Sequence, residues 1–185
     1  IEDFGMTLDA YEPKTPLEKR ALAFVRRRAR DWPKGRESSV VLWGLEHGQG
    51  KTHLGVAYCL AVLEKAVEVR WWRTSDFIHR CEIERFSEGW GALDAVREVP
   101  LLVLDDVDKV NMAGNRGDFV TETFLRLLDS RYNTNRAVVI TTQLTRARFT
   151  DLFGTAAADR LPARWWVEVQ GPSGRAGGEE DGSGM

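Results

Sequence analysis

Short apolar runs alternate with longer segments of helical periodicity along most of the chain. The apolar runs are bounded by turn residues, which is typical of strands buried in a parallel sheet. We expect five such strands, at residues 39–43, 67–72, 101–104, 137–141 and 165–169. The segments between them favour helices, at residues 51–65, 74–86, 88–97, 118–131 and 145–153. This alternation predicts an α/β fold with a five-stranded parallel sheet flanked by helices.

Another helix is expected ahead of the first strand. Thr15 can cap it, Pro16 suits its first position and Glu18 can complete a capping box. We expect it to end near Arg30. Residues 1–36 are therefore interpreted as an entry segment and helix, residues 37–170 as the core, and residues 171–185 as a disordered Gly-rich tail. The chain begins with Ile1 rather than Met, so we interpret it as a part of a longer protein.

The charge balance excludes nucleic-acid binding by bulk charge alone. Lys and Arg number 26 and Asp and Glu number 28, for a net charge of −2, so any such binding needs a local patch. No run reaches the roughly 20 apolar residues that cross a bilayer, and no signal-peptide pattern is present. The two cysteines lack metal-ligand spacing, which is typical of a reducing interior. We therefore expect a cytoplasmic protein without a membrane segment.

A glycine-rich loop lies between the first expected core strand and the helix after it, and residues 44–52 read GLEHGQGKT. Glycines let backbone N–H groups approach phosphate oxygens, a Lys reaches the β and γ phosphates, and a hydroxyl can bind Mg²⁺. The helix N-terminus adds its dipole. We expect ATP to contact this segment through Gly48, Gln49, Gly50, Lys51, Thr52 and His53, with Thr52 also binding Mg²⁺.

The loop departs from the standard spacing. The standard first Gly lies five residues before the second, and Leu45 occupies that position. Gly44 is one residue too early, as if the loop carried an insertion. The second half, Gly48 to Thr52, is intact, and the alternative interpretation is a glycine-rich helix cap with a surface Lys.

Two carboxylates follow the apolar run at residues 101–104, about fifty residues after the loop. Asp105 is expected to hold Mg²⁺ through water beside Thr52, and Asp106 to orient or deprotonate an attacking water. An Asp-Asp pair at a strand end is often only a turn. Behind a phosphate loop at this separation, it indicates a nucleoside triphosphatase.

With these motifs, the sequence resembles the DnaC/IstB-like AAA+ ATPases, which include replicative helicase loaders and transposition ATPases. The resemblance runs from about Phe4 to Gln170, with matching stretches at residues 50–54, 101–106, 127–132, 140–144 and 159–161. It implies a P-loop AAA+ core with ATP and Mg²⁺ as cofactors. Many AAA+ proteins carry a helical lid after the core. Here only a strand and the tail follow Arg160, so we expect no lid, and turnover that needs a neighbouring subunit.

The resemblance also implies roles for three further residues. Gln143 takes the place of the usual Asn that contacts the attacking water and the γ-phosphate. Arg160 corresponds to the arginine finger, which acts on the ATP of a neighbouring subunit. The alternative for Arg160 is a salt-bridged surface residue, which the adjacent Asp159 favours. Tyr11 is a candidate contact for the base, or else a ring that packs on the core.

Basic and aromatic residues suit contact with single-stranded DNA in two places. Four arginines cluster at residues 26–30, and four more, at positions 70, 73, 80 and 85, surround Trp71, Trp72 and Phe77. In the family, the helices after the second strand touch single strands, which indicates residues 73–97 here. Glutamates share this segment and the aromatics could be core, so a solvated face is the alternative.

The resulting expectation is a Mg²⁺-dependent ATPase that acts in DNA replication as a helicase loader. Its expected partners are a replicative helicase, single-stranded DNA and further copies of itself, assembled through the ATP site. The helicase-docking segment of such loaders usually lies ahead of this core. The alternatives are an IstB-like transposition ATPase, a P-loop small-molecule kinase and a nucleotide switch with little turnover.

Overall fold

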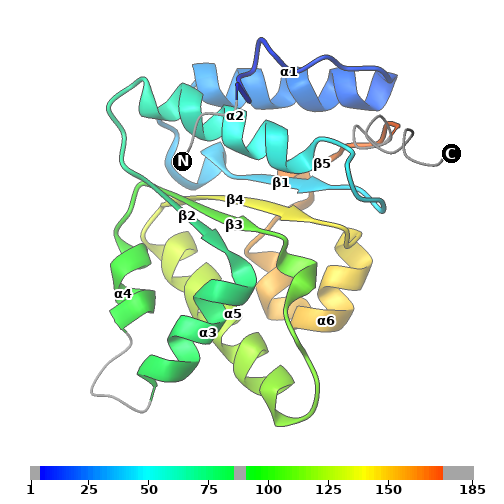
Figure 1. Ribbon diagram of the computed structural model, residues 1–185. Helices are drawn as coiled ribbons and strands as arrows, with labels where there is room; N and C mark the ends of the chain where they lie inside the picture. The colour runs from blue at the N-terminus through cyan, green and yellow to red at the C-terminus, as the bar shows by residue number, and fades with distance from the viewer. Residues whose placement is uncertain (1–4, 86–90, 173–185) are drawn as a thin grey trace, which may run out of the picture.

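A five-stranded sheet forms the centre of the computed structural model, which describes residues 5–85 and 91–172 (Figure 1). Its strand order is β2-β3-β4-β1-β5, and every neighbouring pair is parallel. The predicted five-stranded parallel sheet is confirmed. The strands are β1 (Val40–Trp43), β2 (Val69–Arg73), β3 (Leu101–Asp105), β4 (Ala137–Thr142) and β5 (Trp166–Glu168).

Helices cover both faces of the sheet. One face carries α1 (Pro16–Arg30) and α2 (Lys51–Leu63). The other carries α3 (Thr74–Glu84), α4 (Gly91–Arg97), α5 (Asn115–Asn133) and α6 (Arg146–Asp159). Three short 3₁₀ turns complete the described chain: η1 (Gly35–Ser38), η2 (Val107–Lys109) and η3 (Ala163–Trp165). None of the helices within these residues combines the length and apolar character that a membrane crossing requires.

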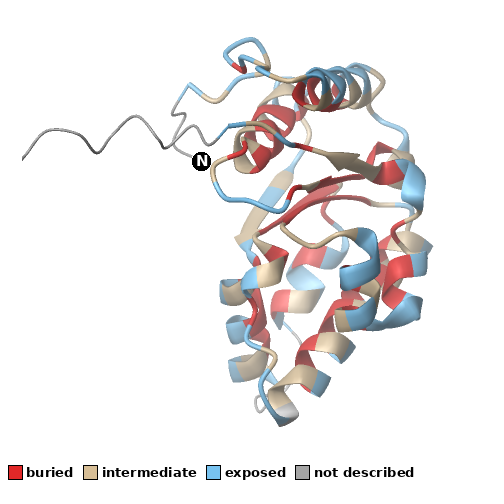
Figure 2. Cartoon of the chain, turned by 90° about the vertical axis from the view of Figure 1, so that its right-hand side faces the viewer, coloured by how far each residue is buried: buried red, intermediate tan, exposed pale blue. Residues whose placement is uncertain are grey.

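Side chains of the central strands alternate between the two helical layers. Leu101 and Val103 pack with α1 and α2, whereas Leu102 and Leu104 pack with the helices of the opposite face. This is the period of two that a pleated strand imposes. Both β3 and β4 are buried along their whole length (Figure 2), which explains why their sequences read as continuous apolar runs.

The start of α1 has the predicted capping box. The Thr15 hydroxyl accepts a hydrogen bond from the Glu18 amide at 3.1 Å, and the Glu18 carboxylate accepts one from the Thr15 amide at 3.0 Å. Thr15 Oγ1 also donates to the carbonyl of Gln170 at 2.5 Å. The entry helix is therefore tied to the chain that leaves β5.

Arg131 on α5 holds the connection between α4 and β3. Its guanidinium donates to the carbonyls of Val96 at 2.6 Å, Val99 at 3.0 Å and Pro100 at 3.3 Å, and also to the carbonyl of Ala137 at the start of β4. The side chain is buried, and this burial lowers its pKa to about 9. Arg131 thus joins four backbone positions from three segments.

Two predicted boundaries need correction. Helix α5 begins at Asn115 rather than near Asp118. The predicted helix end near Phe153 is confirmed, because Gly154 has non-helical φ and ψ values of +84° and 159°, and this kink separates the first part of α6 from a second helical segment that runs to Asp159. Trp165 lies in η3, and not in the last strand; it is buried, whereas Trp166 in β5 is partly exposed.

Some predictions fall on residues outside the described ranges. These are the start of the family resemblance at Phe4, the junction of two helices near Ser87, and most of the tail, from residue 173 onward. Both cysteines, Cys59 and Cys81, are buried free thiols in the core. The expected core position of Cys59 is confirmed.

Candidate functional site

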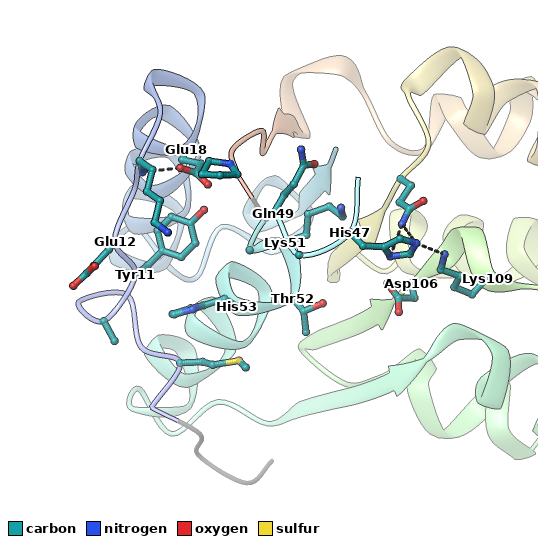
Figure 3. Close-up of a pocket in the computed structure, with 17 residues that line it drawn as sticks. Tyr11, Glu12, Glu18, His47, Gln49, Lys51, Thr52, His53, Asp106 and Lys109 are labelled. Carbon is teal, nitrogen blue, oxygen red and sulfur yellow. Dashed lines mark hydrogen bonds between the residues drawn. The ribbon is translucent and has the colours of Figure 1, made fainter. Parts of the chain in front are cut away.

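The glycine-rich loop joins the end of β1 to the start of α2, as predicted. Gly48 and Gly50 have φ values of +75° and +82°, which few side chains tolerate. Gly50 is the N-cap of α2, and a Cβ on it would lie 2.7 Å from the ring of Tyr11. Residues 48–53 line a pocket of about 670 Å³ (Figure 3). The unpaired amides of the first turn of α2 therefore belong to a site that suits anions.

The extra residue of the loop is accommodated away from this pocket. The Gly44 amide donates to the carbonyl of Thr142 at 3.2 Å, and a Cβ on Gly44 would lie 2.2 Å from the carbonyl oxygen of Val169. Leu45 follows with 66% of its surface exposed. The loop thus bulges into solvent at Leu45, and its second half lies at the start of α2.

Lys51 is buried within the loop. Its ammonium group donates to the carbonyls of Gly44 at 2.9 Å and Glu46 at 2.6 Å. Burial lowers the pKa of Lys51, and the carboxylates of Asp108 and Asp106 partly offset this effect. A phosphate oxygen in the pocket would be a charged acceptor in place of two neutral carbonyls.

Asp105, at the end of β3, is the centre of an inner cluster formed by Thr52, Asp105 and Thr141. Asp105 Oδ1 accepts hydrogen bonds from Thr52 Oγ1 at 3.2 Å and from Thr141 Oγ1 at 2.5 Å. Burial raises the pKa of Asp105, and the hydrogen bond from Thr141 opposes that shift. The predicted neighbours Thr52 and Asp105 are therefore brought together, with Thr52 lining the pocket and Asp105 buried behind it.

The inner cluster fits Mg²⁺ bound together with a nucleotide. A hydroxyl and a carboxylate provide two oxygen ligands, and Mg²⁺ usually takes the rest from phosphates and water. Across residues 5–85 and 91–172, no group of three or more His, Cys, Asp and Glu side chains could hold a metal ion.

Asp106 has an unusual backbone conformation beside the inner cluster. Its φ is +54°, and its amide donates to Thr141 Oγ1 at 2.9 Å. Thr141 therefore binds the Asp105 carboxylate and the Asp106 backbone, and Asp106 lines the pocket. Its action on an attacking water stays a prediction.

Aromatic side chains form the opposite end of the pocket (Figure 3). The rings of Tyr11 and His53 meet edge to face with centroids 5.1 Å apart, and His53 Nε2 lies 3.1 Å from the carbonyl of Thr7. Tyr11 is also part of the core beneath α1, but its buried hydroxyl has no hydrogen-bond partner among the described residues. Both interpretations of Tyr11 thus describe the same ring, which packs on the core and lines the pocket.

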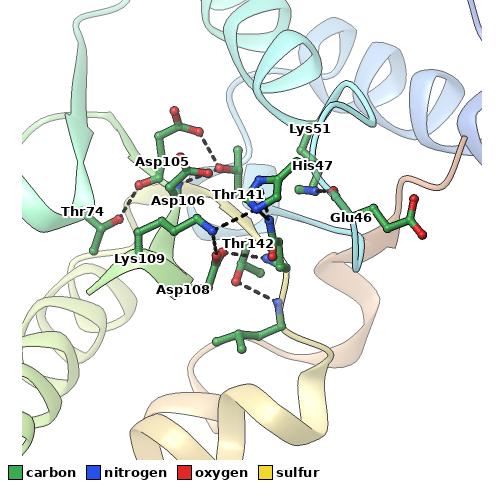
Figure 4. Close-up of polar contacts among 12 residues, drawn as sticks. Glu46, His47, Lys51, Thr74, Asp105, Asp106, Asp108, Lys109, Thr141 and Thr142 are labelled. Carbon is green, nitrogen blue, oxygen red and sulfur yellow. Dashed lines mark hydrogen bonds and ion pairs between the residues drawn. The ribbon is translucent and has the colours of Figure 1, made fainter. Parts of the chain in front are cut away.

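Gln143 belongs to an outer cluster with His47 and Lys109, and the last two are labelled in Figure 4. Gln143 Nε2 lies 2.7 Å from His47 Nδ1 and 2.9 Å from His47 Nε2. Lys109 Nζ lies 3.3 Å from His47 Nε2 and 3.4 Å from Asp108 Oδ2. Gln143 lines the pocket together with Asp106, as its expected role requires.

Arg160 follows α6 and is not among the residues that line the pocket. Its Nη2 lies 2.7 Å from Asp129 Oδ1 on α5, and its guanidinium lies over the ring of Tyr132, 5.0 Å from the centroid. Within one chain, Arg160 thus has the salt bridge of the alternative interpretation. Its side chain is still 36% exposed, and its action on a neighbouring subunit stays a prediction.

The aromatic residues expected near DNA divide between core and surface. Phe77 is fully buried and meets Trp72 edge to face at 5.9 Å, whereas Trp71 and Trp72 are partly exposed. Arg80 pairs with Glu84. The arginines of α1 also have contacts within the chain, Arg26 with Asp9, Arg30 with Asp31, and Arg27 and Arg28 with the Phe24 ring.

Sequence reasoning missed the outer cluster. It gives neither His47 nor Lys109 a role in binding ATP. The available signal is position: His47 precedes the intact half of the phosphate loop, and Lys109 follows the paired carboxylates by three residues. Thr141, which binds Asp105, is also missed, although it lies near the end of the strand that leads to Gln143.

Comparisons with known proteins support this description. The sequence matches the family of IstB-like ATP binding proteins over residues 6–175. No curated protein shows a significant match to it. A DnaC helicase loader structure is 24% identical with a TM-score of 0.80, and the alignment covers 90% of this chain and 98% of that one. A DnaI structure is 19% identical with a TM-score of 0.73, covering 90% and 89%.

A third structure, of the replication initiator DnaA bound to AMPPCP and single-stranded DNA, is 16% identical with a TM-score of 0.76, covering 92% of this chain and 51% of that one. At such identities the likeness establishes the fold, and the predicted α/β P-loop core of AAA+ type is confirmed. Because the family match spans almost the whole sequence, the chain belongs to the IstB-like ATP binding proteins.

Proposed function

We propose that this protein binds Mg²⁺–ATP in the pocket at the carboxyl edge of the sheet and hydrolyses it. The observation that carries the proposal is the 3.2 Å contact between Thr52 Oγ1 and Asp105 Oδ1, with the buried Lys51 next to Thr52 in sequence. P-loop enzymes use a hydroxyl, a carboxylate and a Lys to bind a triphosphate and its metal.

Each residue has a defined task in this proposal. The amides of residues 48–52 and the Lys51 ammonium group bind phosphate oxygens, and Thr52 and Asp105 hold the metal. Mg²⁺, when bound, neutralises charge on the phosphates. Asp106 orients or deprotonates the attacking water, and Gln143 contacts that water and the terminal phosphate.

A complete site would require a second copy of the chain. No arginine of the described residues lines the pocket, and an arginine facing the terminal phosphate stabilises the charge that develops during transfer. We propose that Arg160 of a neighbouring copy supplies this group. Arg160 would leave its ion pair with Asp129 and bind the phosphate instead, so ATP hydrolysis would depend on assembly.

We further propose that the protein loads or remodels a replicative helicase on single-stranded DNA. This is supported by the similarity in fold to the DnaC helicase loader and by the exposed arginines of β2 and α3. The second candidate, a transposition ATPase assembled on target DNA, is supported by the IstB-like family to which the chain belongs.

The rate of ATP hydrolysis with and without single-stranded DNA tests the proposal. We would compare the wild type with Lys51→Ala, which removes the phosphate-binding cation, and with Asp106→Asn, which keeps shape but removes the charge. Lys34→Ala is the matched control, because Lys34 is an exposed lysine ion-paired with Asp31 at 3.2 Å, away from the pocket.

We expect stimulation by DNA in the wild type and the control, and a loss of turnover in the other two variants. Transfer of phosphate to a metabolite would instead indicate a kinase, and tight ATP binding without turnover a switch. Co-purification with a helicase or with a transposase would separate the two candidates within the ATPase class.

A further inference from the structure

The pocket has a direction that is set by its two ends. Tyr11 and His53 lie at one end, Lys51 and Thr52 in the middle, and His47 with Lys109 at the other (Figure 3). A nucleotide with its base at the aromatic end and its phosphates over the α2 amides would direct its last phosphate toward His47 and Lys109. ADP, one phosphate shorter, would not extend as far.

Three separate segments hold the outer cluster together. His47 comes from the phosphate loop, Lys109 from η2, and Gln143 from the end of β4 (Figure 4). Asp108 supports the outer cluster. Its carboxylate accepts a hydrogen bond from the backbone amide of Gln143 at 2.7 Å and lies 3.4 Å from Lys109 Nζ. The Asp108 side chain is only 8% exposed, whereas that of Lys109 is 43% exposed. A buried carboxylate thus anchors the outer cluster, and its lysine is open to the pocket.

The two unusual features of the sequence meet in this cluster. The first half of the loop is one residue longer than the standard pattern, and it carries His47 to the end of β4. Gln143 is one methylene longer than Asn, and its amide nitrogen lies 2.7 Å from the His47 ring. The longer loop and the longer side chain therefore match each other sterically.

The charges around the outer cluster favour a cation that binds the terminal phosphate. A terminal phosphate carries roughly two negative charges at neutral pH, and three carboxylates, those of Asp105, Asp106 and Asp108, surround this end of the site. Among the described residues the cations that line the pocket are Lys14, Lys51 and Lys109. Lys14 follows Tyr11 in sequence, and its amide binds Glu18. Lys109 is thus the cation available at the terminal-phosphate end beyond Lys51.

We propose that Lys109, held by His47, binds the terminal phosphate of ATP and lets a single chain distinguish ATP from ADP. This inference rests on the proposed binding of ATP. In the absence of nucleotide, the Lys109 ammonium group contacts the His47 ring and the Asp108 carboxylate. With ATP, a phosphate oxygen takes the place of the ring as its acceptor. His47 is a positioning residue, because it orders both Lys109 and the Gln143 amide.

The test measures dissociation constants for AMPPNP and for ADP, each with Mg²⁺, by calorimetry. In the wild type we expect tighter binding of AMPPNP. Lys109→Ala should weaken AMPPNP binding about tenfold and leave ADP binding unchanged, because a charged hydrogen bond to the terminal phosphate is lost. Lys109→Arg should keep the preference. His47→Ala should reduce it by a smaller factor, and it should add little to Lys109→Ala.

Controls separate this inference from the proposed function. Lys34→Ala should behave as the wild type, and the unfolding temperature of each variant without nucleotide should match that of the wild type, since Lys109 and His47 are exposed. Equal loss of both ligands, unchanged constants, or tighter AMPPNP binding in Lys109→Ala would overturn the inference while ATP binding stands. If the wild type binds neither nucleotide and resembles Lys51→Ala, the proposed function itself is wrong.

Discussion

The inner and outer clusters lie at the same edge of the sheet, but they differ in depth. In the inner cluster, Thr141 is fully buried and Asp105 is 7% exposed. In the outer cluster, His47 and Lys109 are exposed. Electrostatic interactions are stronger where water is excluded. The inner cluster is therefore part of the fold as well as of the site, whereas the outer cluster can rearrange around a ligand at small cost.

The largest effect is expected from Asp105→Asn. The substitution removes the negative charge that would hold Mg²⁺ and keeps the shape, so ATP hydrolysis should fall by at least about a hundredfold. The free energy of unfolding without nucleotide should not fall, because a buried carboxylate is replaced by a neutral amide. Steady-state ATPase assays and thermal unfolding measure the two quantities. Unchanged hydrolysis would remove Asp105 from the metal site.

The pH dependence of the free energy of unfolding should report the protonation of Asp105. Burial raises the pKa of Asp105 above its ordinary value of 3.8, so the folded protein binds this proton more tightly than the unfolded chain does. Its contribution to stability is complete below that value and is lost as the pH rises through the raised pKa. The advantage in unfolding temperature of Asp105→Asn over the wild type should grow across this window. Calorimetry would contradict the prediction if the difference stayed constant with pH.

A smaller effect is expected from Gln143→Asn in the outer cluster. The shorter side chain no longer reaches His47, and the amide loses the contact that orders it. We expect hydrolysis to fall by about three- to tenfold, which corresponds to one hydrogen bond, with little change in unfolding temperature. If Asn raises the rate instead, the contact with His47 restrains the site rather than orders it.

The smallest effect is expected from Leu45→Ser. Leu45 is largely exposed on the bulge of the loop, where substitutions usually change stability by less than about 0.5 kcal/mol. Binding of ATP and the unfolding temperature should both match the wild type. A marked loss of binding would mean that the Leu45 side chain contributes to the shape of the pocket.

The sequence predicted the inner cluster better than the outer one, for a physical reason. Thr52 lies in the first turn of the helix that follows β1, and Asp105 ends β3. The parallel sheet brings both places to the same edge, so their meeting can be expected from the order of the residues alone. The contact of His47 with Gln143 joins residues 96 positions apart, and it depends on the path of a bulged loop and on side-chain length. The periodicity of the sequence predicts neither the path of the loop nor the fit of the two side chains.

The same distinction holds for the fold. Apolar runs located β1, β3 and β4, because burial on both faces leaves a continuous pattern. The edge strands β2 and β5 are partly exposed. The second helical segment after Gly154 was missed, since a glycine is a usual helix end and the pattern gave no sign that the chain becomes helical again after the kink. The position of Trp165 in η3 was missed because a buried ring looks the same in a strand and in a short turn.

The guanidinium of Arg131 has a mechanical consequence. It fastens the last turn of α4 and the two residues ahead of β3 to the first residue of β4. A load applied to α4 would meet this clamp before it reached the strand that ends in Asp105. The hydrogen bonds of Arg131 would transmit this force to α5 and the sheet as a rigid movement. The carboxylate of Asp105 would then keep its position.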